Sequence, residues 1–412
     1  MRCQRQHRLH SADAEPFSWT VRLSCRFWVP NSRCPRKQPV EAYALMTLLI
    51  APFLQAVVVN KGSDLHIKVG GPPRIRISGT LVPLQVDPLT PEAAWSMIGE
   101  TMTPDVREQF VLSNEADYAL SVPGIGRFRV NAFRTRGSAA CVLRLVGDEP
   151  MSLKALPVPD VIRRLALEPR GLVLVTGPTG SGKTTTLAAM VDTVNSERAV
   201  HVLTIEDPIE VLHRDKMASV NQRELGTDTA DWATALRAAM RQDPDVILIG
   251  EMRDAETVKA ALSAAETGHF VMSTLHTTDA KETVNRIIDF FLPHEQKQVR
   301  LGLAASLKGI VCQRLVPRAD GVGRVCAMEI AVNNPRLAEA VADPDKTDSI
   351  ADIIAEGSYS GMQTFDQDLL RLVLEGTVSV PTAKLVSSNS HDFAIMLKRA
   401  GVNPSLVDTE AS

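Results

Sequence analysis

Residues 177–184 read Gly-Pro-Thr-Gly-Ser-Gly-Lys-Thr, the spacing G-x-x-x-x-G-K-[ST] of a phosphate-binding loop. The apolar run 171–176 predicts a strand before it, and residues 184–190 predict a helix after it. This order directs backbone N–H groups and a helix N-terminus at one point, which suits a polyphosphate. We expect Lys183 to contact the β- and γ-phosphates and the Thr184 hydroxyl to bind Mg²⁺. The predicted nucleotide-binding residues are Gly177, Pro178, Thr179, Gly180, Ser181, Gly182, Lys183, Thr184 and Thr185.

Two further strand ends carry side chains that can act on a phosphate. Glu251 follows the apolar run 246–249, and we expect it to polarise the attacking water. His276 follows the predicted strand 269–274, and beside the other motifs we interpret it as a γ-phosphate sensor that works through a hydrogen bond. The alternatives are a solvated acid at a helix N-terminus for Glu251 and a purely structural role for His276.

Acidic residues also cluster after the predicted strand 200–205. Glu206, Asp207 and Glu210 lie within the segment Thr-Ile-Glu-Asp-Pro-Ile-Glu. A carboxylate at this edge can bind Mg²⁺, directly or through water, or orient the nucleophile. We therefore predict Glu206 as a metal-binding and catalytic residue. For Asp207 and Glu210, an acid-rich turn before a proline is the alternative.

Arginines alternate along the predicted strand 126–133 and beyond its end. Arg127 and Arg129 share one face of that strand, and Arg134 and Arg136 share another. We predict that Arg127 and Arg134 act as arginine fingers at a nucleotide held by a neighbouring subunit. A solvated sheet face is the alternative.

The strands and helices expected around these groups indicate an α/β fold. A length of 412 residues favours two domains. Residues 46–146 alternate apolar and polar side chains and predict a small α+β domain with an antiparallel sheet, including a helix that starts at Pro91 with Thr90 as its N-cap. Residues 147–160 carry three prolines and predict a linker. Residues 161–295 predict a parallel sheet wrapped by helices. Its expected strands lie at 171–176, 200–205, 245–250 and 269–274. Residues 296–412 are expected to be helical.

The N-terminal residues 1–45 differ from the rest in their excess of basic residues and their lack of periodicity. We expect a disordered extension, or sequence upstream of a start at Met46; a basic arm for nucleic acid or membrane is the alternative. The apolar stretch 45–59 contains Pro52 and Gln55 and is shorter than the roughly 20 residues that span a bilayer. It predicts a packed helix at a domain start, with a signal sequence as the alternative.

Composition narrows the class of partner. A net charge of -3 and an aromatic content of 4% argue against nucleic acid. The six cysteines form no C-x-x-C pair, so neither a zinc site nor a redox motif is supported.

Taken together, the motifs resemble the ATPases of bacterial type IV pilus and type II secretion machines, with the twitching-motility retraction branch as the best match. The resemblance covers roughly residues 60 to 400. Its motifs are Gly177–Thr184 as Walker A, Thr204–Glu210 as the acidic box, Asp243–Glu251 with the following Met-Arg-Asp as Walker B, Ala265–Thr278 as the histidine box, and the segments Lys61–His66, Gly126–Phe133 and Gly361–Gln367.

This resemblance implies a homo-hexameric ring whose subunits have a PAS-like N-terminal domain and a RecA-like domain that binds ATP and Mg²⁺. It implies that Glu206 and Glu251 serve the metal and the water and that His276 senses phosphate. It also implies work on an inner-membrane pilus platform protein, from a peripheral position at the cytoplasmic face of that membrane.

Two departures bear on the direction of action. The four-cysteine zinc loop of many extension and secretion members is missing, which favours retraction. The Ala-Ile-Arg segment of many retraction members is also missing, and residues 334–340 read Asn-Pro-Arg-Leu-Ala-Glu-Ala instead. A pilus-assembly or secretion ATPase, a RecA-like nucleic-acid motor and a regulatory nucleotide sensor remain the alternatives.

Overall fold

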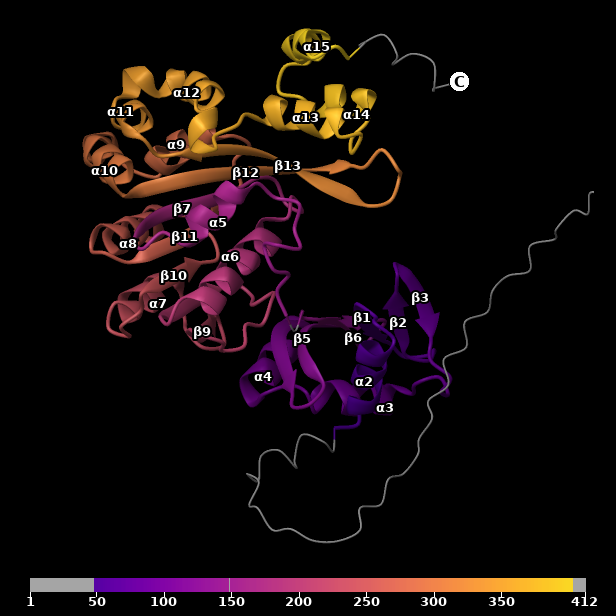
Figure 1. The fold of residues 1–412 in the computed structure, drawn as a ribbon. Coiled ribbons are helices and arrows are strands. Elements are labelled where there is room, and N and C mark those ends of the chain that lie inside the picture. Colours follow the sequence, from indigo (N-terminus) through magenta and orange to yellow (C-terminus); the bar gives the residue numbers. More distant parts are fainter. Residues whose placement is uncertain (1–47, 148, 403–412) are drawn as a thin grey trace, which may run out of the picture. The chain divides into compact units, whose positions relative to one another are not determined.

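The computed structural model describes residues 48–147 and 149–402, so the predictions for residues 1–45 lie outside it (Figure 1). The chain divides into two compact units, Met1–Val146 and Gly147–Ser412. Together their helices and strands form an α/β protein, as predicted. Over the described residues, no helix combines the length and the apolar character needed to cross a membrane.

The first unit is built on a six-stranded sheet in the order β3-β2-β1-β6-β5-β4, in which every neighbouring pair is antiparallel, as predicted. Its strands are β1 (Asp64–Ile67), β2 (Arg74–Ile77), β3 (Thr80–Pro83), β4 (Glu115–Val122), β5 (Gly126–Thr135) and β6 (Ser138–Leu145). Its helices are α2 (Ala51–Val59), α3 (Pro91–Gly99) and α4 (Pro104–Ser113).

Two helix predictions for this unit are confirmed. Helix α3 begins at Pro91, and the Thr90 hydroxyl caps it by accepting a hydrogen bond from the Ala93 N–H at 3.2 Å. Helix α2 packs as expected, because Phe53, Leu54 and other apolar residues on it join the buried core of the unit.

The second unit contains a seven-stranded sheet in the order β13-β12-β7-β11-β10-β8-β9. The pairs from β12 through β9 are parallel, and β13 adds to the edge antiparallel to β12. The predicted strands appear as β7 (Gly171–Thr176), β8 (His201–Glu206), β10 (Val246–Ile249) and β11 (Phe270–Leu275). All residues of β7, β10 and β11 are buried, which explains their unbroken apolar runs.

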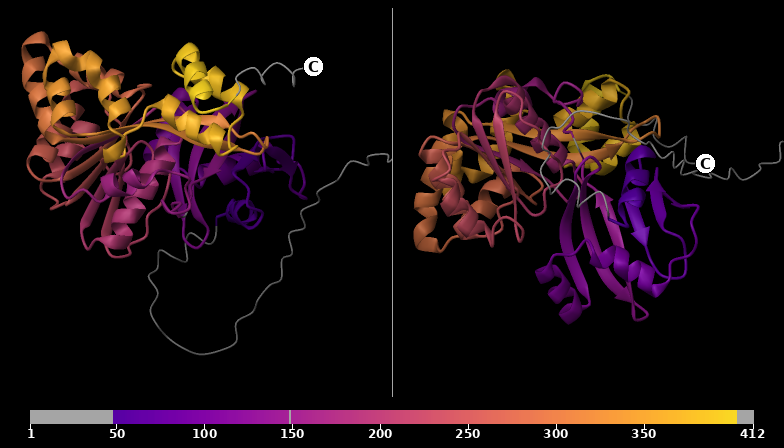
Figure 2. Two further views of the ribbon diagram at one scale, coloured as in Figure 1. Left: turned by 45° about the horizontal axis from the view of Figure 1, so that its top comes forward. Right: turned by 90° about the horizontal axis from the view of Figure 1, so that it is seen from below.

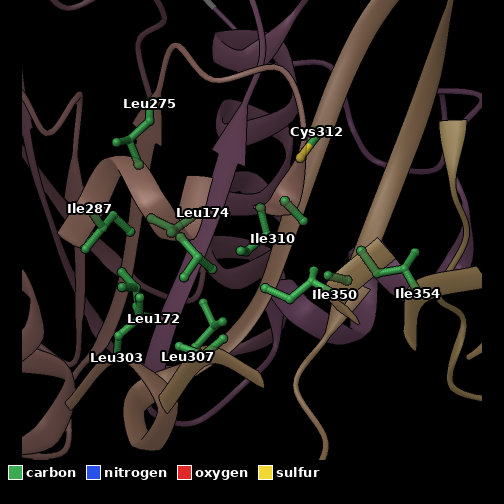
Figure 3. Packing of buried hydrophobic residues seen from close by; sticks show 14 of the residues in the cluster. Leu172, Leu174, Leu275, Ile287, Leu303, Leu307, Ile310, Cys312, Ile350 and Ile354 are labelled. Atoms are coloured by element: carbon green, nitrogen blue, oxygen red, sulfur yellow. The ribbon is translucent and has the colours of Figure 1, made fainter. Parts of the chain in front are cut away.

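Helices cover both faces of this sheet (Figures 1 and 2). Alternate residues of β7 point to opposite faces: Leu172 and Leu174 join one core cluster, and Val173 and Val175 join the other. Figure 3 shows the first cluster, where Leu172 and Leu174 pack with side chains from neighbouring strands and helices. The helices preceding β12 are α5 (Asp160–Ala166), α6 (Lys183–Glu197), α7 (Trp232–Ala239), α8 (Ala255–Glu266), α9 (Ala280–Asp289) and α10 (Pro293–Ser306).

The expectation that residues 296–412 are all helical is wrong. Strands β12 (Leu307–Pro317) and β13 (Arg324–Val332) lie in this region and extend the main sheet beyond β7. Strand β9 (Ser219–Glu224) is a further strand that we did not predict. Helices follow β13, as expected. They are α11 (Pro335–Ala342), α12 (Ile350–Glu356), α13 (Phe365–Leu374), α14 (Val380–Val386) and α15 (Ser390–Arg399), with short 3₁₀ turns at Pro344–Ser349 and Ser358–Ser360.

Candidate nucleotide-binding site

The glycine loop connects the carboxyl end of β7 to the start of α6, in the predicted order of strand, loop and helix. Gly177 has a φ of 140°, and a Cβ atom there would lie 2.4 Å from the Gln313 carbonyl oxygen. Gly182 caps α6 with a φ of 93°. Only glycine meets both demands without strain, so these two positions allow the backbone to turn tightly into the helix.

The Lys183 ammonium lies over this loop. Its Nζ donates hydrogen bonds to the carbonyl oxygens of Gly177 at 2.8 Å and Pro178 at 3.1 Å. Burial lowers the pKa of Lys183, while the charges of Glu251 and Glu210 oppose that shift. The Lys183 ammonium and the N-terminus of α6 place positive charge at one point, which favours a polyphosphate there.

A cavity of about 560 Å³ opens at the carboxyl ends of the parallel strands. This edge is where open α/β sheets bind their ligands. Most predicted site residues of the second unit line the cavity: Thr179, Gly180, Gly182, Lys183, Thr184, Thr185, Glu206, Glu251 and His276. Asp207 and Glu210 line it too. Gly177, Pro178 and Ser181 are not among its lining residues; Gly177 and Ser181 are buried within the loop, and Pro178 is exposed.

Glu251 lies just beyond β10, and both of its carboxylate oxygens have cationic or ring partners. Oε1 forms an ion pair with Arg253, and Oε2 lies 3.5 Å from His276 Nε2. The Glu251 side chain is 15% exposed, and the His276 side chain is 55% exposed. The backbone on either side is fixed to β8 and β11, because the Gly250 N–H donates to Ile205 and the Met252 N–H donates to Thr274. The carboxylate therefore has a defined position at the cavity wall.

Glu206 ends β8 and shares the same cavity. Its Oε1 accepts hydrogen bonds from Thr204 Oγ1 at 2.6 Å and from Gln222 Nε2 at 3.0 Å. Burial raises the pKa of Glu206, and these hydrogen bonds offset the rise only in part. A cation beside this carboxylate would favour its charged form.

The donors in the cavity fit Mg²⁺ that arrives with a nucleotide. Thr184, Glu206 and Glu210, whose side chains carry hydroxyl and carboxylate oxygens, line the same space. The described residues hold no group of three or more His, Cys, Asp or Glu side chains able to bind a metal ion by itself. Mg²⁺ in phosphate-transfer sites needs only one or two protein carboxylates, because phosphates and waters complete its shell.

Several residues of the cavity wall were not predicted from the sequence. His213, Trp232, Arg253, Leu315 and Arg324 all line it. Arg253 could have been predicted, because it lies in the Met-Arg-Asp segment that follows Glu251 in Walker B. Leu315 and Arg324 could not, because they belong to strands in a region that we expected to be helical. Burial lowers the pKa of His213 to about 4, so this ring is neutral at pH 7.

The predicted arginine fingers belong to the first unit. Arg127 and Arg134 both lie on β5, an odd number of residues apart in an unbroken register, so they point to opposite faces. Arg127 Nη1 donates to Ser121 Oγ at 3.0 Å. The Arg134 guanidinium lies 5.4 Å from the centroid of the Phe110 ring on α4. Their action at a nucleotide stays a prediction.

The glycine loop at the end of a buried parallel strand, with carboxylates at neighbouring strand ends, defines a P-loop nucleotide-binding protein. A family model described as "Type II/IV secretion system protein" matches residues 40–359, and the chain belongs to this family.

Named relatives refine this placement. The "Type IV pilus retractation ATPase PilT" of Pseudomonas aeruginosa is 44% identical over 78% of this chain and 93% of its own length. A "Twitching motility protein" of Neisseria gonorrhoeae is 43% identical over 92% of this chain and 97% of its own. The crystal structure of the pilus retraction motor PilT with bound ADP matches with a TM-score of 0.77 and 41% identity, covering 83% of this chain and 98% of that one. The predicted resemblance to retraction ATPases is confirmed.

Proposed function

We propose that this protein is an ATPase motor that hydrolyses ATP to drive pilus retraction in twitching motility. The observation that carries the proposal is the cavity in which the phosphate loop, Lys183 and Glu251 meet. The relatives named for pilus retraction and twitching motility, at 43–44% identity over most of their length, supply the direction of the work.

Several groups in the cavity have a proposed role in binding or in proton transfer. The loop N–H groups and Lys183 would hold the phosphates, and Thr184 and Glu206 would hold Mg²⁺. The ion, when bound, would neutralise charge that develops on the phosphate oxygens. Glu251 would orient a water toward the γ-phosphorus and accept its proton, as the new O–P bond forms and the bond to the bridging β–γ oxygen breaks. His276 would contact the γ-phosphate by a hydrogen bond.

At the level of the assembly, we propose a homo-hexamer in which the first unit is PAS-like and the second is RecA-like. Arg127 and Arg134 would reach a nucleotide, in their own subunit or in a neighbour. Hydrolysis would move one unit against the other and turn an inner-membrane pilus platform protein, with the ring peripheral to the cytoplasmic face of that membrane.

Deleting the gene in its host and scoring surface pili tests the direction of action. Retraction predicts cells with excess pili that never shorten, restored by the wild-type gene and not by Lys183→Ala. Cells without pili would indicate an assembly ATPase instead. Unchanged pili, together with salt-sensitive DNA binding by the purified protein, would favour the nucleic-acid motor.

A further inference from the structure

Strand β12 runs directly beside the strand that carries the phosphate loop. The last parallel pair between them joins Cys312 to Thr176, so the next residue of β12, Gln313, lies level with Gly177. Gln313 is 1% exposed. A Cβ atom added at Gly177 would lie 2.4 Å from the Gln313 carbonyl oxygen. The Gln313 backbone therefore packs against the start of the loop.

The Gln313 side chain reaches the other end of the same loop. Its Nε2 donates a hydrogen bond to Thr186 Oγ1 at 2.7 Å. Thr186 lies in the first turn of α6, two residues after Thr184, and is 3% exposed. The same Nε2 lies 3.3 Å from Cys326 Sγ on β13. One buried residue therefore contacts the loop at its first glycine and at the helix that ends it, and ties both to the β12–β13 pair.

We propose that Gln313 is a positioning residue for the nucleotide, a role that rests on the proposed function of the cavity as an ATP site. By fixing Gly177 and Thr186, it would set the curvature of the loop between them before ATP arrives. The Lys183 ammonium depends on this curvature, since it is hydrogen-bonded to the Gly177 carbonyl. A loop that is already ordered loses less entropy on binding, so the contact would strengthen ATP binding without touching the ligand.

The bond has an energetic reason to persist. A hydrogen bond between two buried side chains contributes modestly when made, but breaking it leaves a desolvated hydroxyl or amide without a partner. Without this bond the loop would be looser. The loop's contacts with the phosphates would then weaken both in the bound ground state and in the transition state. Affinity for ATP should therefore fall more than the turnover rate at saturation.

Calorimetry with ATP and Mg²⁺ on the full chain tests the proposal. Gln313→Leu should raise the Kd for ATP by roughly fivefold to tenfold and change kcat at saturating ATP by less than about twofold. Thr186→Val should raise the Kd similarly, and the double variant should bind ATP no more weakly than Gln313→Leu, because both changes remove the bond between Gln313 and Thr186. Thr186→Ser keeps the hydroxyl, so this variant should bind ATP with the affinity of wild type.

Gln363→Leu is the matched control. Gln363 Nε2 likewise donates a side-chain hydrogen bond within the second unit, to the Met328 carbonyl at 3.0 Å, but Gln363 does not line the nucleotide cavity. Its loss should lower the melting temperature and leave the Kd for ATP unchanged.

Two outcomes would overturn the proposal while wild type still binds ATP. One is an unchanged Kd in Thr186→Val, which also decides the matter if Gln313→Leu does not fold. The other is an equal loss of affinity in Gln363→Leu, which would reduce the effect to general stability. A wild-type protein that takes up no ATP would instead refute the proposed function itself.

Discussion

Glu251 is the residue on which turnover should depend most. Its carboxylate is largely buried, faces the cavity, and has Arg253 at one oxygen and His276 at the other. Each carboxylate oxygen can accept more than one hydrogen bond, so a water can bind to Glu251 beside these partners. The side chain is therefore well placed as a proton acceptor, while the phosphates would be held by other groups.

This separation of roles predicts the behaviour of Glu251→Gln. The amide keeps the size of the side chain and loses its basicity, so ATP affinity should stay within about threefold of wild type while kcat falls by roughly 10² or more. Steady-state phosphate release, measured beside calorimetric binding, checks both numbers. Glu256→Gln is the control, since Glu256 on α8 forms an exposed ion pair with Arg237 on α7. Turnover of Glu251→Gln at the wild-type rate would refute the assignment.

A second prediction concerns Glu329 and the stability of the folded protein. Burial raises the pKa of this carboxyl to about 7, although the Ala280 N–H donates to its Oε1 at 2.8 Å. The folded state then binds a proton that the unfolded state, with a pKa near 4.5, has released. The stabilising contribution of the protonated form is complete below pH 4.5 and is lost as the pH rises through 7.

Glu329→Gln mimics the neutral form at every pH. Relative to wild type, its free energy of unfolding should rise by up to about 3 kcal/mol between pH 4.5 and pH 8. Denaturant unfolding at several pH values checks this, with the exposed Glu356→Gln as control. A difference between variant and wild type that does not change with pH would contradict the raised pKa.

At the scale of elements, the site is assembled from strand ends, and this is where sequence reasoning succeeded. Strands such as β7 and β10 are buried on both faces, so their unbroken apolar runs could be recognised. The glycine spacing then identified the phosphate loop. Because the strands are parallel, the residues at their carboxyl ends meet at one sheet edge. Glu206, Glu251 and His276 do line one cavity.

Other elements gave no comparable signal. Helix α10 ends at Ser306 and β12 starts at Leu307, with no proline or turn between them to mark the change. The edge strand β9 reads Ser-Val-Asn-Gln-Arg-Glu, and its pairing with β8 decides its conformation rather than its own propensity. Leu315 and Arg324 line the cavity, and Gln313 contacts the loop, because they lie on β12 and β13. Their part in the site could not be predicted once that region was expected to be helical.

At the scale of the whole molecule, the proposed ring raises the question of where the arginines act. Arg127 and Arg134 lie on opposite faces of β5. Since the two guanidinium groups cannot face the same way from one strand, we expect their contributions to differ. If Arg127 completes a site in the neighbouring subunit, its effect depends on assembly and not on its own cavity.

Mixing variants distinguishes the two cases. Arg127→Ala should lower kcat by at least roughly tenfold, and Lys183→Ala should be inactive. An arginine that acts between subunits predicts that a mixture of the two proteins regains activity, because a Lys183→Ala subunit still supplies Arg127 to its neighbour. Arg129→Ala, on the same strand face, is the control and should remain active. A mixture no more active than the sum of its parts, in rings confirmed by light scattering, would contradict action between subunits.

The central claim is that the loop between β7 and α6 binds a nucleoside triphosphate. Isothermal titration calorimetry with ATP and Mg²⁺, on wild type and on Lys183→Ala, tests it most directly. We predict uptake of ATP by wild type and at least roughly 100-fold weaker binding by the variant, because the loop loses the cation that faces the phosphates. Absence of binding to wild type, or equal binding by both proteins, would contradict the account.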